Sequence, residues 1–245
     1  CDGSGIRLGQ SVGAATGQMH NFSGWRFITP PVVWPRGIVV NAQGARFCNE
    51  QVYGERLGHE MMEHQGGKAW LILDKRLLRA AWRECFVGGW WYFQWLPAML
   101  SMLLAKKAKT PAALAAKIGA DPAVLAAEIA AYNAAAAAPS GDELQPSDPQ
   151  GKTPDMCTAL AAPPYYAMDI SVTSPVLPMA AITLGGLQVN EDSGLVLNAQ
   201  GQPIVGLYAA GRAAVGIPSA RYISGLSLAD CVFSGRRAAR HAAQV

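Results

Sequence analysis

Residues 203–243 place a strand, a glycine and a helix start in an order that can hold a flat ligand. The sequence "GLYAA" predicts a short apolar strand over residues 206–210 that ends at Gly211, and after a loop a helix starts near Ser227. Glycine at a strand end lets the backbone approach a ring, and a helix start offers unpaired N–H groups and a positive dipole end. These groups suit the negative ring edge of a reduced flavin. Spacing alone is equally compatible with an ordinary glycine-containing turn.

The opening sequence "CDGSGIRLG" is also rich in glycine, at Gly3, Gly5 and Gly9. The phosphate-binding finger of a dinucleotide fold needs its third glycine one residue earlier and must follow a buried parallel strand. Only two residues precede Gly3, the first of these glycines. We therefore predict a turn and a helix that starts at Ser4 and Gly5.

Composition excludes several classes of partner and site. The chain has 245 residues, 51% of them hydrophobic, which is enough for one large or two small domains. The net charge of +3 is spread without long runs, so we expect no nucleic-acid partner. Five cysteines at long spacings, with no C-x-x-C, indicate a reducing, cytoplasmic setting without a disulfide framework. The four histidines show no H-E-x-x-H spacing, and we expect no metal.

Residues 86–105 carry no charge over a length near that of a membrane span. Gly88, Gly89, Gln94 and Pro97 interrupt the stretch, and its tryptophans lie inside it rather than at its two ends. These features argue against a spanning helix. They favour a buried segment or an apolar lid, with shallow membrane contact as the alternative.

The remaining pattern mixes strands and helices. Residues 37–50 predict a strand, a tight turn and a returning strand, and residues 185–211 predict a strand-rich meander. Thr110 and Asp121 each precede a proline and an alanine-rich run, which predicts two capped helices. A final helix over residues 226–243 is predicted to have an apolar side that includes Leu228, Val232 and Ala239.

The tail resembles the C-terminal FAD segment of the flavoprotein family that contains fumarate reductases and 3-ketosteroid dehydrogenases. The matching stretches, which extend over most of the chain, are "GIVVNAQGARFCNE" (37–50), "PPYYAMDI" (163–170), "TLGGLQVNEDSGLVL" (183–197), "GLYAAG" (206–211) and "GRRAARHAA" (235–243). The family carries its G-x-G-x-x-G earlier in a longer chain. The resemblance therefore implies that an ADP-binding half lies outside this sequence. Because an incomplete sheet exposes an edge, we also expect pairing with that half.

The resemblance implies an α+β or α/β fold in which a substrate domain is inserted into a partial, Rossmann-like FAD-binding domain. We expect residues 1–29 and 161–245 to form the FAD-binding part. Residues 30–160 would form the α+β substrate cap. A generic apolar binding cap over residues 40–160 is the alternative interpretation of this middle region.

Cofactor contacts follow from the same resemblance. The opening matches a T-G-D-G-I turn with Ser4 in place of the aspartate, and Asp2 lies close by. Arg212 stands where the family has a glutamate beside the ribityl chain of FAD. Ser227 and Leu228 match residues whose backbone meets the flavin ring. The cofactor-binding residues implied are Asp2, Gly211, Arg212, Ser227 and Leu228.

The sequence "ARYISGLS" (220–227) bears on the substrate. Fumarate reductases bind carboxylates through arginines, and one of these aligns with Tyr222; Arg221 is one residue away. The stretch instead resembles ketosteroid dehydrogenases that introduce a 4-ene into 3-oxo-5α-steroids, where a Tyr-x-Ser pair acts. Here that pair is Tyr222 and Ser224. The resemblance implies that flavin N5 takes a hydride, that Tyr222 takes a proton beside the ketone, and that electrons pass to an external acceptor.

A second tyrosine is expected in the site. Tyr53 follows the Asn49–Glu50 pair by three residues, and Tyr92 in the tryptophan-rich stretch is its rival. Two alternatives to a steroid dehydrogenase stay open. One is a fumarate or enoate reductase of the same family, and the other is a catalytically silent fragment that cannot hold FAD alone.

Overall fold

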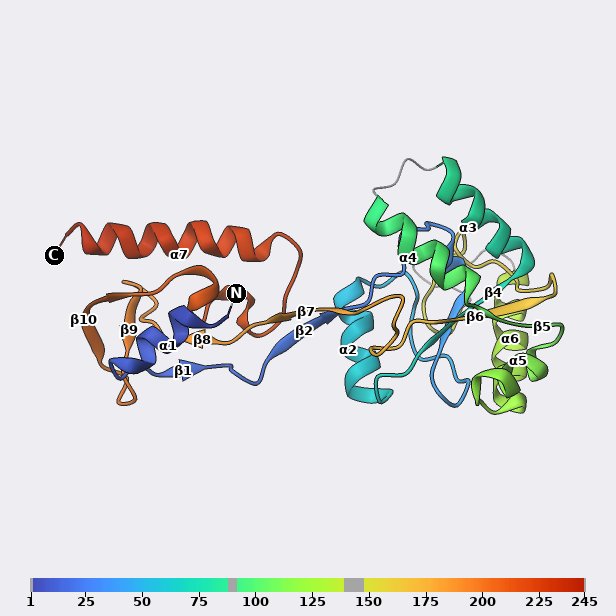
Figure 1. Ribbon diagram of the computed structural model, residues 1–245, viewed down its shortest axis with the longest axis horizontal. Helices are drawn as coiled ribbons and strands as arrows, with labels where there is room; N and C mark the ends of the chain where they lie inside the picture. Colours follow the sequence, from blue (N-terminus) through green and yellow to red (C-terminus); the bar gives the residue numbers. More distant parts are fainter. Residues whose placement is uncertain (1, 88–91, 139–147, 245) are drawn as a thin grey trace. The chain divides into compact units, whose positions relative to one another are not determined.

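The computed structural model describes residues 2–87, 92–138 and 148–244, which form two compact units (Figure 1). One unit contains residues 1–24 and 181–245, and the other contains residues 25–180. The chain passes between them through β2 (Phe22–Trp25) and β7 (Ala180–Thr183), which pair with each other. The expected discontinuous domains, with bounds 1–29 and 161–245 for one and 30–160 for the other, stay a prediction.

The middle unit is built on a four-stranded antiparallel sheet of order β3-β4-β6-β5. Its strands are β3 (Ile38–Val40), β4 (Trp70–Asp74), β5 (Lys106–Ala108) and β6 (Tyr165–Asp169). Its helices are η1 (Trp34–Arg36), α2 (Gly54–His64), α3 (Lys75–Val87), α4 (Tyr92–Leu103), α5 (Pro111–Ile118) and α6 (Pro122–Ala137). Leu71, Ile72 and Leu73 on the central strand are fully buried, because helices and loops cover both faces of the sheet.

Both helix starts in this unit are confirmed. The Thr110 hydroxyl accepts a hydrogen bond from the Ala113 N–H at 3.2 Å, and the Asp121 carboxylate accepts one from the Ala123 N–H at 2.7 Å. Each cap precedes a proline in the first turn. Such caps satisfy backbone donors that the helix leaves unpaired. The proline-rich stretch that follows α6 falls largely outside the described residues.

The returning strand expected after residue 44 is wrong. Asn41 closes the turn by accepting hydrogen bonds from the Gln43 and Ala45 N–H groups, both at 3.0 Å. Beyond the turn only one bridge forms, between Val40 and Arg46, and β3 pairs instead with β4. The reason is electrostatic, since the buried Arg46 side chain is bound by carboxylates elsewhere in the unit.

The other unit is assembled from short elements around a small core. They are α1 (Ser4–Ser11), β1 (Thr16–Gly17), β8 (Gly186–Leu187), β9 (Leu195–Leu197), β10 (Pro203–Tyr208), η2 (Gly211–Ala213), η3 (Ile217–Ser219) and α7 (Leu226–Ala242). β1 pairs with β8. Within residues 185–211, β9 pairs antiparallel with β10 and Val189 bridges to Val196, which confirms that this stretch is rich in strands. The helix at Ser4 is also confirmed, and with it the mixed α and β class.

The final helix exists as expected, but its predicted apolar side does not face the core. α7 buries Asp230, Ser234 and Ala238, while Leu228 and Val232 are 75% and 61% exposed; Ala239 is exposed as well. These three buried residues are each four apart in the sequence, so they share one face of the helix. That face is selected by hydrogen bonds to the loops beneath it and not by apolar area.

Candidate functional site

A pocket of about 280 Å³ opens in the unit formed by the two ends of the chain. The start of α1 forms one side, and Arg212 and Ala213 of η2 form another. The full lining is Asp2, Gly3, Ser4, Gly5, Ile6, Thr183, Gly185, Arg212 and Ala213. The structure therefore brings together Asp2 and Arg212, two of the residues expected at a cofactor.

Charged and polar groups edge this pocket. The Asp2 carboxylate accepts hydrogen bonds from the Ser4 N–H at 3.0 Å and from Arg7 at 3.3 Å. The Ser4 N–H is the main cause that lowers the pKa of Asp2, so this carboxylate is ionised at neutral pH. The Arg212 guanidinium donates to the Thr183 carbonyl. The residue before α1 is Gly3, which has no side chain, and Asp2 takes one backbone N–H at the helix start. The pocket thus offers a carboxylate, a guanidinium and a helix N-terminus to one ligand.

Gly211 connects β10 to η2 in a conformation that other residues rarely adopt, with a φ of 56°. Its N–H donates to the Ser234 hydroxyl at 2.8 Å, and this hydroxyl donates to the Asp230 carbonyl at 2.5 Å. A Cβ at position 211 would lie 2.7 Å from the Cys231 sulfur. The turn before Arg212 is therefore fixed directly against α7.

Sequence reasoning missed the residues of α7 that hold the loop. Asp230 is 3% exposed, and its carboxylate accepts a hydrogen bond from the Ile217 N–H at 3.4 Å. Ser234 is 2% exposed and holds Gly211. The signal was present in the sequence as two polar residues four apart in a helix, a spacing that places them on one face.

The expected catalytic pair lies in the loop between η3 and α7. Tyr222 is 9% exposed and Ser224 is exposed. Gly225 follows with a φ of 86° and turns the chain into the helix. Ser227 and Leu228 lie in the first turn of α7, where the Leu228 N–H donates to the Gly225 carbonyl at 3.1 Å. These residues are close in sequence, and their contact with a cofactor stays a prediction.

Tyr53 lies in the middle unit, immediately before α2, and is 39% exposed. Its ring packs edge-on against Trp25, with centroids 5.5 Å apart, and against Phe27 at 6.4 Å. Its rival Tyr92 begins α4 in the same unit. Tyr53 and Tyr222 belong to different units.

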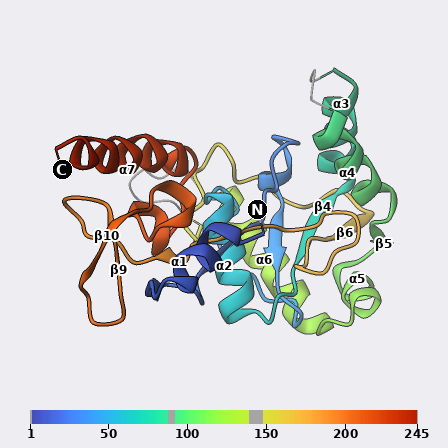
Figure 2. The same cartoon turned by 60° about the vertical axis from the view of Figure 1, so that its left-hand side comes forward.

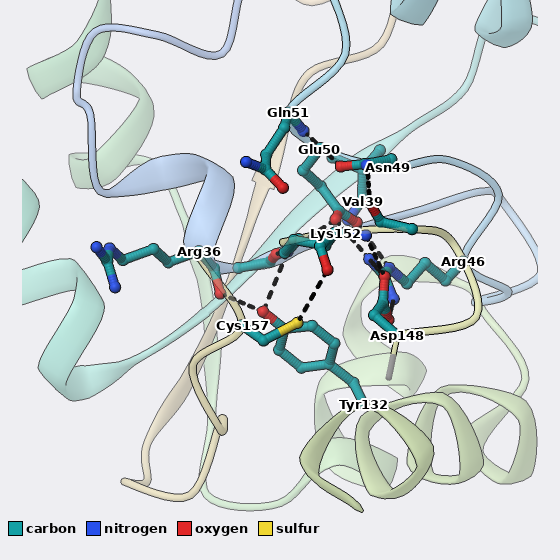
Figure 3. A network of polar contacts seen from close by, with 12 residues as sticks. Arg36, Val39, Arg46, Asn49, Glu50, Gln51, Tyr132, Asp148, Lys152 and Cys157 are labelled. Carbon is teal, nitrogen blue, oxygen red and sulfur yellow. Dashed lines mark hydrogen bonds and ion pairs between the residues drawn. The ribbon is translucent and has the colours of Figure 1, made fainter. Parts of the chain in front are cut away.

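A buried ion network holds the segment that leads to Tyr53 (Figure 3). Arg46 donates two hydrogen bonds to Glu50, at 2.9 and 2.7 Å, and binds Asp148 as well. Lys152 Nζ lies 2.7 Å from Glu50 Oε2. All four side chains are at most 7% exposed. The two cations and two carboxylates balance in charge, as burial requires.

Tyr132 of α6 completes this network. Its hydroxyl donates to the Arg36 carbonyl at 2.8 Å and accepts from Lys152 at 3.1 Å. Lys152 also donates to the Gly37 carbonyl at 2.5 Å, and Glu50 accepts from the Val39 N–H at 2.8 Å. The network therefore joins β3, the turn after it, α6 and the loop that contains Lys152.

The pKa directions follow from these contacts. Burial raises the pKa of Asp148, but hydrogen bonds from Arg46 and from the Lys152 N–H outweigh burial, and the net shift is downward. Burial lowers the pKa of Lys152 despite the neighbouring Glu50. Burial also lowers the pKa of Arg46, but its bonds to Glu50 and Asp148 produce a net rise. The network is thus most stable with Asp148 ionised.

Among the described residues, no group of three or more histidine, cysteine or carboxylate side chains could hold a metal ion. None of the helices described is long and apolar enough to cross a bilayer. The chemistry available lies in the pocket beside α1, in the loop before α7 and around Tyr53.

These features define a mixed α/β protein with a polar pocket beside α1. The family model described as "FAD binding domain" matches residues 1–228, so the chain belongs to this family. The resemblance inferred from the sequence is confirmed, and the cofactor of the family is FAD.

Two curated relatives represent the two branches of the resemblance. The chain is 51% identical to the 3-oxo-5-alpha-steroid 4-dehydrogenase of Comamonas testosteroni, over 86% of this chain and 39% of that protein. It is 30% identical to the NADH:fumarate oxidoreductase of Klebsiella pneumoniae (strain 342), over 99% of this chain and 24% of that protein. The chain therefore spans less than half of the length of these relatives.

A solved structure supports the same fold. The 3-ketosteroid-delta4-(5alpha)-dehydrogenase from Rhodococcus jostii RHA1, in complex with 4-androstene-3,17-dione, matches with a TM-score of 0.75 and 29% identity. The match covers 99% of this chain and 45% of that chain. The fold is thus that of a part of an FAD-binding oxidoreductase.

The pocket residues fit FAD. The Arg212 guanidinium is a positive group, which suits phosphate oxygens or the negative edge of the flavin ring. The Asp2 carboxylate is an acceptor for hydroxyl groups of a ribose or ribityl chain. That Asp2 and Arg212 hold the cofactor stays a prediction.

The Gly211 turn can be tested by a mutational cycle. We expect Gly211→Ala to lower the free energy of unfolding by about 2–4 kcal/mol, since the left-handed conformation costs about 1 kcal/mol and overpacking about 1–3 kcal/mol. Gly206→Ala is the control, because Gly206 also has a positive φ of 78° but open space around it. Urea unfolding of both variants measures these losses. The double variant Gly211→Ala with Cys231→Ala then shows how much of the loss in unfolding free energy comes from the contact with the Cys231 sulfur. Equal losses for Gly206→Ala and Gly211→Ala would contradict contact with Cys231.

The ion network predicts a large loss for one neutralised member. Glu50→Gln leaves Arg46 and Lys152 short of a carboxylate, and we expect a loss of about 3–5 kcal/mol in the free energy of unfolding. Glu60→Gln is the matched control, because the Glu60 carboxylate is partly exposed and 3.9 Å from His64; its loss should stay under about 1 kcal/mol. Urea unfolding decides, and similar losses for both variants would show that the network is not a stabilising unit.

The lowered pKa of Asp148 predicts a pH dependence. A carboxylate whose pKa is lower in the folded state stabilises the fold above its unfolded pKa of about 3.9 and loses this contribution as pH falls through the folded value. We expect the stability difference between the wild type and Asp148→Asn to shrink as pH falls from about 6 to about 3. Urea unfolding across this range measures it. A stability difference that stays constant over this pH range would contradict the lowered pKa of Asp148.

Proposed function

We propose that this chain is part of an FAD-dependent dehydrogenase that oxidises the CH–CH group beside the ketone of a 3-oxosteroid. The observation that carries the proposal is the 51% identity to a 3-oxo-5-alpha-steroid 4-dehydrogenase. The likeness to a 3-ketosteroid dehydrogenase structure in complex with 4-androstene-3,17-dione supports it. Because the chain spans less than half of these relatives, the activity is proposed for the protein that includes the rest of the flavin domain.

Bound FAD would supply the acceptor for the hydride that leaves one carbon of the CH–CH group. Tyr222 is proposed as the base that takes the proton from the carbon beside the ketone. Its side chain is 9% exposed, and a water-poor setting strengthens the hydrogen bonds that govern proton transfer. As the base, Tyr222 would enter the step as the phenolate, to which the Ser224 hydroxyl would donate, and it would become a phenol when it takes the proton. The products are the carbon–carbon double bond, the reduced cofactor and a proton that leaves through Tyr222.

Tyr53 is proposed as the donor to the ketone oxygen, where negative charge develops when the neighbouring proton leaves. It is partly exposed, and Trp25 and Phe27 hold its ring edge-on. The same aromatic cluster provides an apolar wall of the type that a flat steroid needs. Glu50 and its buried ion pairs hold the backbone three residues before Tyr53.

Three further parts of the proposal concern partners and setting. Electrons would leave the reduced cofactor for an external acceptor. A polypeptide with the remaining part of the flavin domain would complete the cofactor site. The four cysteines that the structure describes are free thiols, which supports a reducing, cytoplasmic setting.

A fumarate or enoate reductase is the second candidate, favoured by the 30% identity to an NADH:fumarate oxidoreductase. Dicarboxylate substrates call for arginines in bidentate geometry. In the family resemblance Tyr222 occupies one such arginine position. The steroid reaction is therefore the better supported of the two.

Substitution of Tyr222 tests the proposed chemistry. With FAD and the rest of the flavin domain supplied, we expect Tyr222→Phe to lower kcat on a 3-oxo-5α-steroid by about 10²- to 10⁴-fold, with flavin absorbance unchanged. Tyr208→Phe is the control, because the Tyr208 hydroxyl binds His241 at 2.9 Å at the end of β10, and its kcat should stay near that of the wild type. Dye-coupled turnover measures both variants. Retained activity in Tyr222→Phe, or turnover of succinate in place of the steroid, would reject the proposal.

A further inference from the structure

One side of α4 exposes leucines in a regular row. Leu96, Leu100 and Leu103 are spaced by four and three residues, so they lie on one helix face. They are 49%, 39% and 65% exposed, and Leu104, just beyond the helix, is 64% exposed. The opposite side packs into the core through Ala98 and Met102. Apolar residues therefore lie on both faces of α4, and in the described part of the chain the leucine face is exposed.

The end of α3 extends this apolar surface. Phe86 and Val87 are 70% and 75% exposed, and α3 lies beside α4 in both views (Figures 1 and 2). The six residues together are called the apolar ridge. They are Phe86, Val87, Leu96, Leu100, Leu103 and Leu104. A helix that is apolar all round is normally covered by protein or by lipid.

The charged residues near the apolar ridge indicate what kind of partner would cover it. Residues 75–109 contain seven lysines and arginines and one glutamate. Their net charge of +6 exceeds the +3 of the whole chain, so the remaining residues are net negative. The glutamate, Glu84, is engaged within the unit, because its carboxylate accepts a hydrogen bond from the Val32 N–H at 2.7 Å.

Six of the basic residues are exposed, and together they are called the basic flank. They are Arg76, Arg79, Arg83, Lys106, Lys107 and Lys109. A second copy of the chain would bring the same positive charge to the interface, which disfavours self-association through this surface. An anionic lipid surface offers both an acyl boundary for leucines and negative headgroups for lysines and arginines.

We propose that α3 and α4 dock onto an anionic lipid surface, with α4 lying in the plane of the membrane. The leucines of the apolar ridge enter the boundary between headgroups and acyl chains, and the basic flank contacts the headgroups. This inference rests on exposure, spacing and charge, and it is independent of the proposed function. The two proposals are compatible, because apolar substrates such as steroids partition into membranes.

Vesicle binding of the whole chain tests the inference. We expect the protein to co-sediment with vesicles of phosphatidylglycerol and phosphatidylcholine. Its affinity for pure phosphatidylcholine vesicles should be lower by about tenfold or more, and added salt should reduce this difference in affinity. Leu103→Gln with Leu104→Gln should weaken binding about tenfold or more, since two half-exposed leucines lose their burial in lipid. Lys106→Gln with Lys107→Gln should weaken it about fivefold per lysine.

The matched control is Leu8→Gln with Val12→Gln at α1. These residues are 68% and 57% exposed, close to the values for Leu103 and Leu104, and their substitution should leave vesicle binding unchanged. Circular dichroism and gel filtration of each variant confirm folding and size. The inference is overturned if the wild type stays in the supernatant, if the control loses as much binding as the ridge variant, or if the ridge variant only changes the oligomeric state.

Discussion

Glu50 is the residue on which the middle unit most depends. A carboxylate that is 1% exposed must be paired, and Glu50 is paired by Arg46, by Lys152 and by the Val39 N–H. These partners come from a strand, from the turn after it and from a loop about a hundred residues later. The pairing requirement therefore brings together segments that no apolar pattern would join. Many arrangements of the same sheet would bury its apolar residues, but few of them would also pair four buried charges.

The unit formed by the two chain ends follows a different rule. Its core contains four fully buried apolar residues, Leu187, Val196, Ala209 and Ala214, so apolar burial alone gives it little stability. Its long helix instead turns a polar face inward, and Asp230 and Ser234 bind the loops at Ile217 and Gly211. This geometry leaves Leu228, Val232 and Phe233 on the exposed side of α7. The chain spans less than half of the length of the relatives that it matches.

The sequence predicted features that depend on neighbouring residues. Thr110 and Asp121 cap their helices because a short polar side chain before proline acts within one turn. The meander over residues 185–211 and the helix start at Ser4 depend on local turn chemistry in the same way. Features set by distant residues could not be predicted. The return strand at Arg46 fails because Asp148 binds it, and the inward face of α7 is chosen by loops that precede it.

For the candidate site the same distinction holds. Asp2 and Arg212 are far apart in sequence, and the family resemblance alone indicated that both belong at the cofactor; the structure places them around one pocket. Tyr53 and Tyr222 lie in different units, and their proposed cooperation needs a substrate that contacts both. A resemblance can assign such roles, but spacing within one chain cannot.

The residues of the buried network and the proposed catalytic residues differ in exposure, and their roles differ accordingly. Arg46, Glu50, Asp148 and Lys152 are at most 7% exposed and bind one another, so their charges are neutralised within the fold. Tyr53, three residues after Glu50, is 39% exposed. A group that must meet a substrate needs exposure, and a group that must hold a position needs burial. The resemblance to fumarate reductases and to steroid dehydrogenases includes the motif that builds this network. We therefore infer that the network supports the site without selecting the reaction, and that exposed residues such as Tyr53 select it.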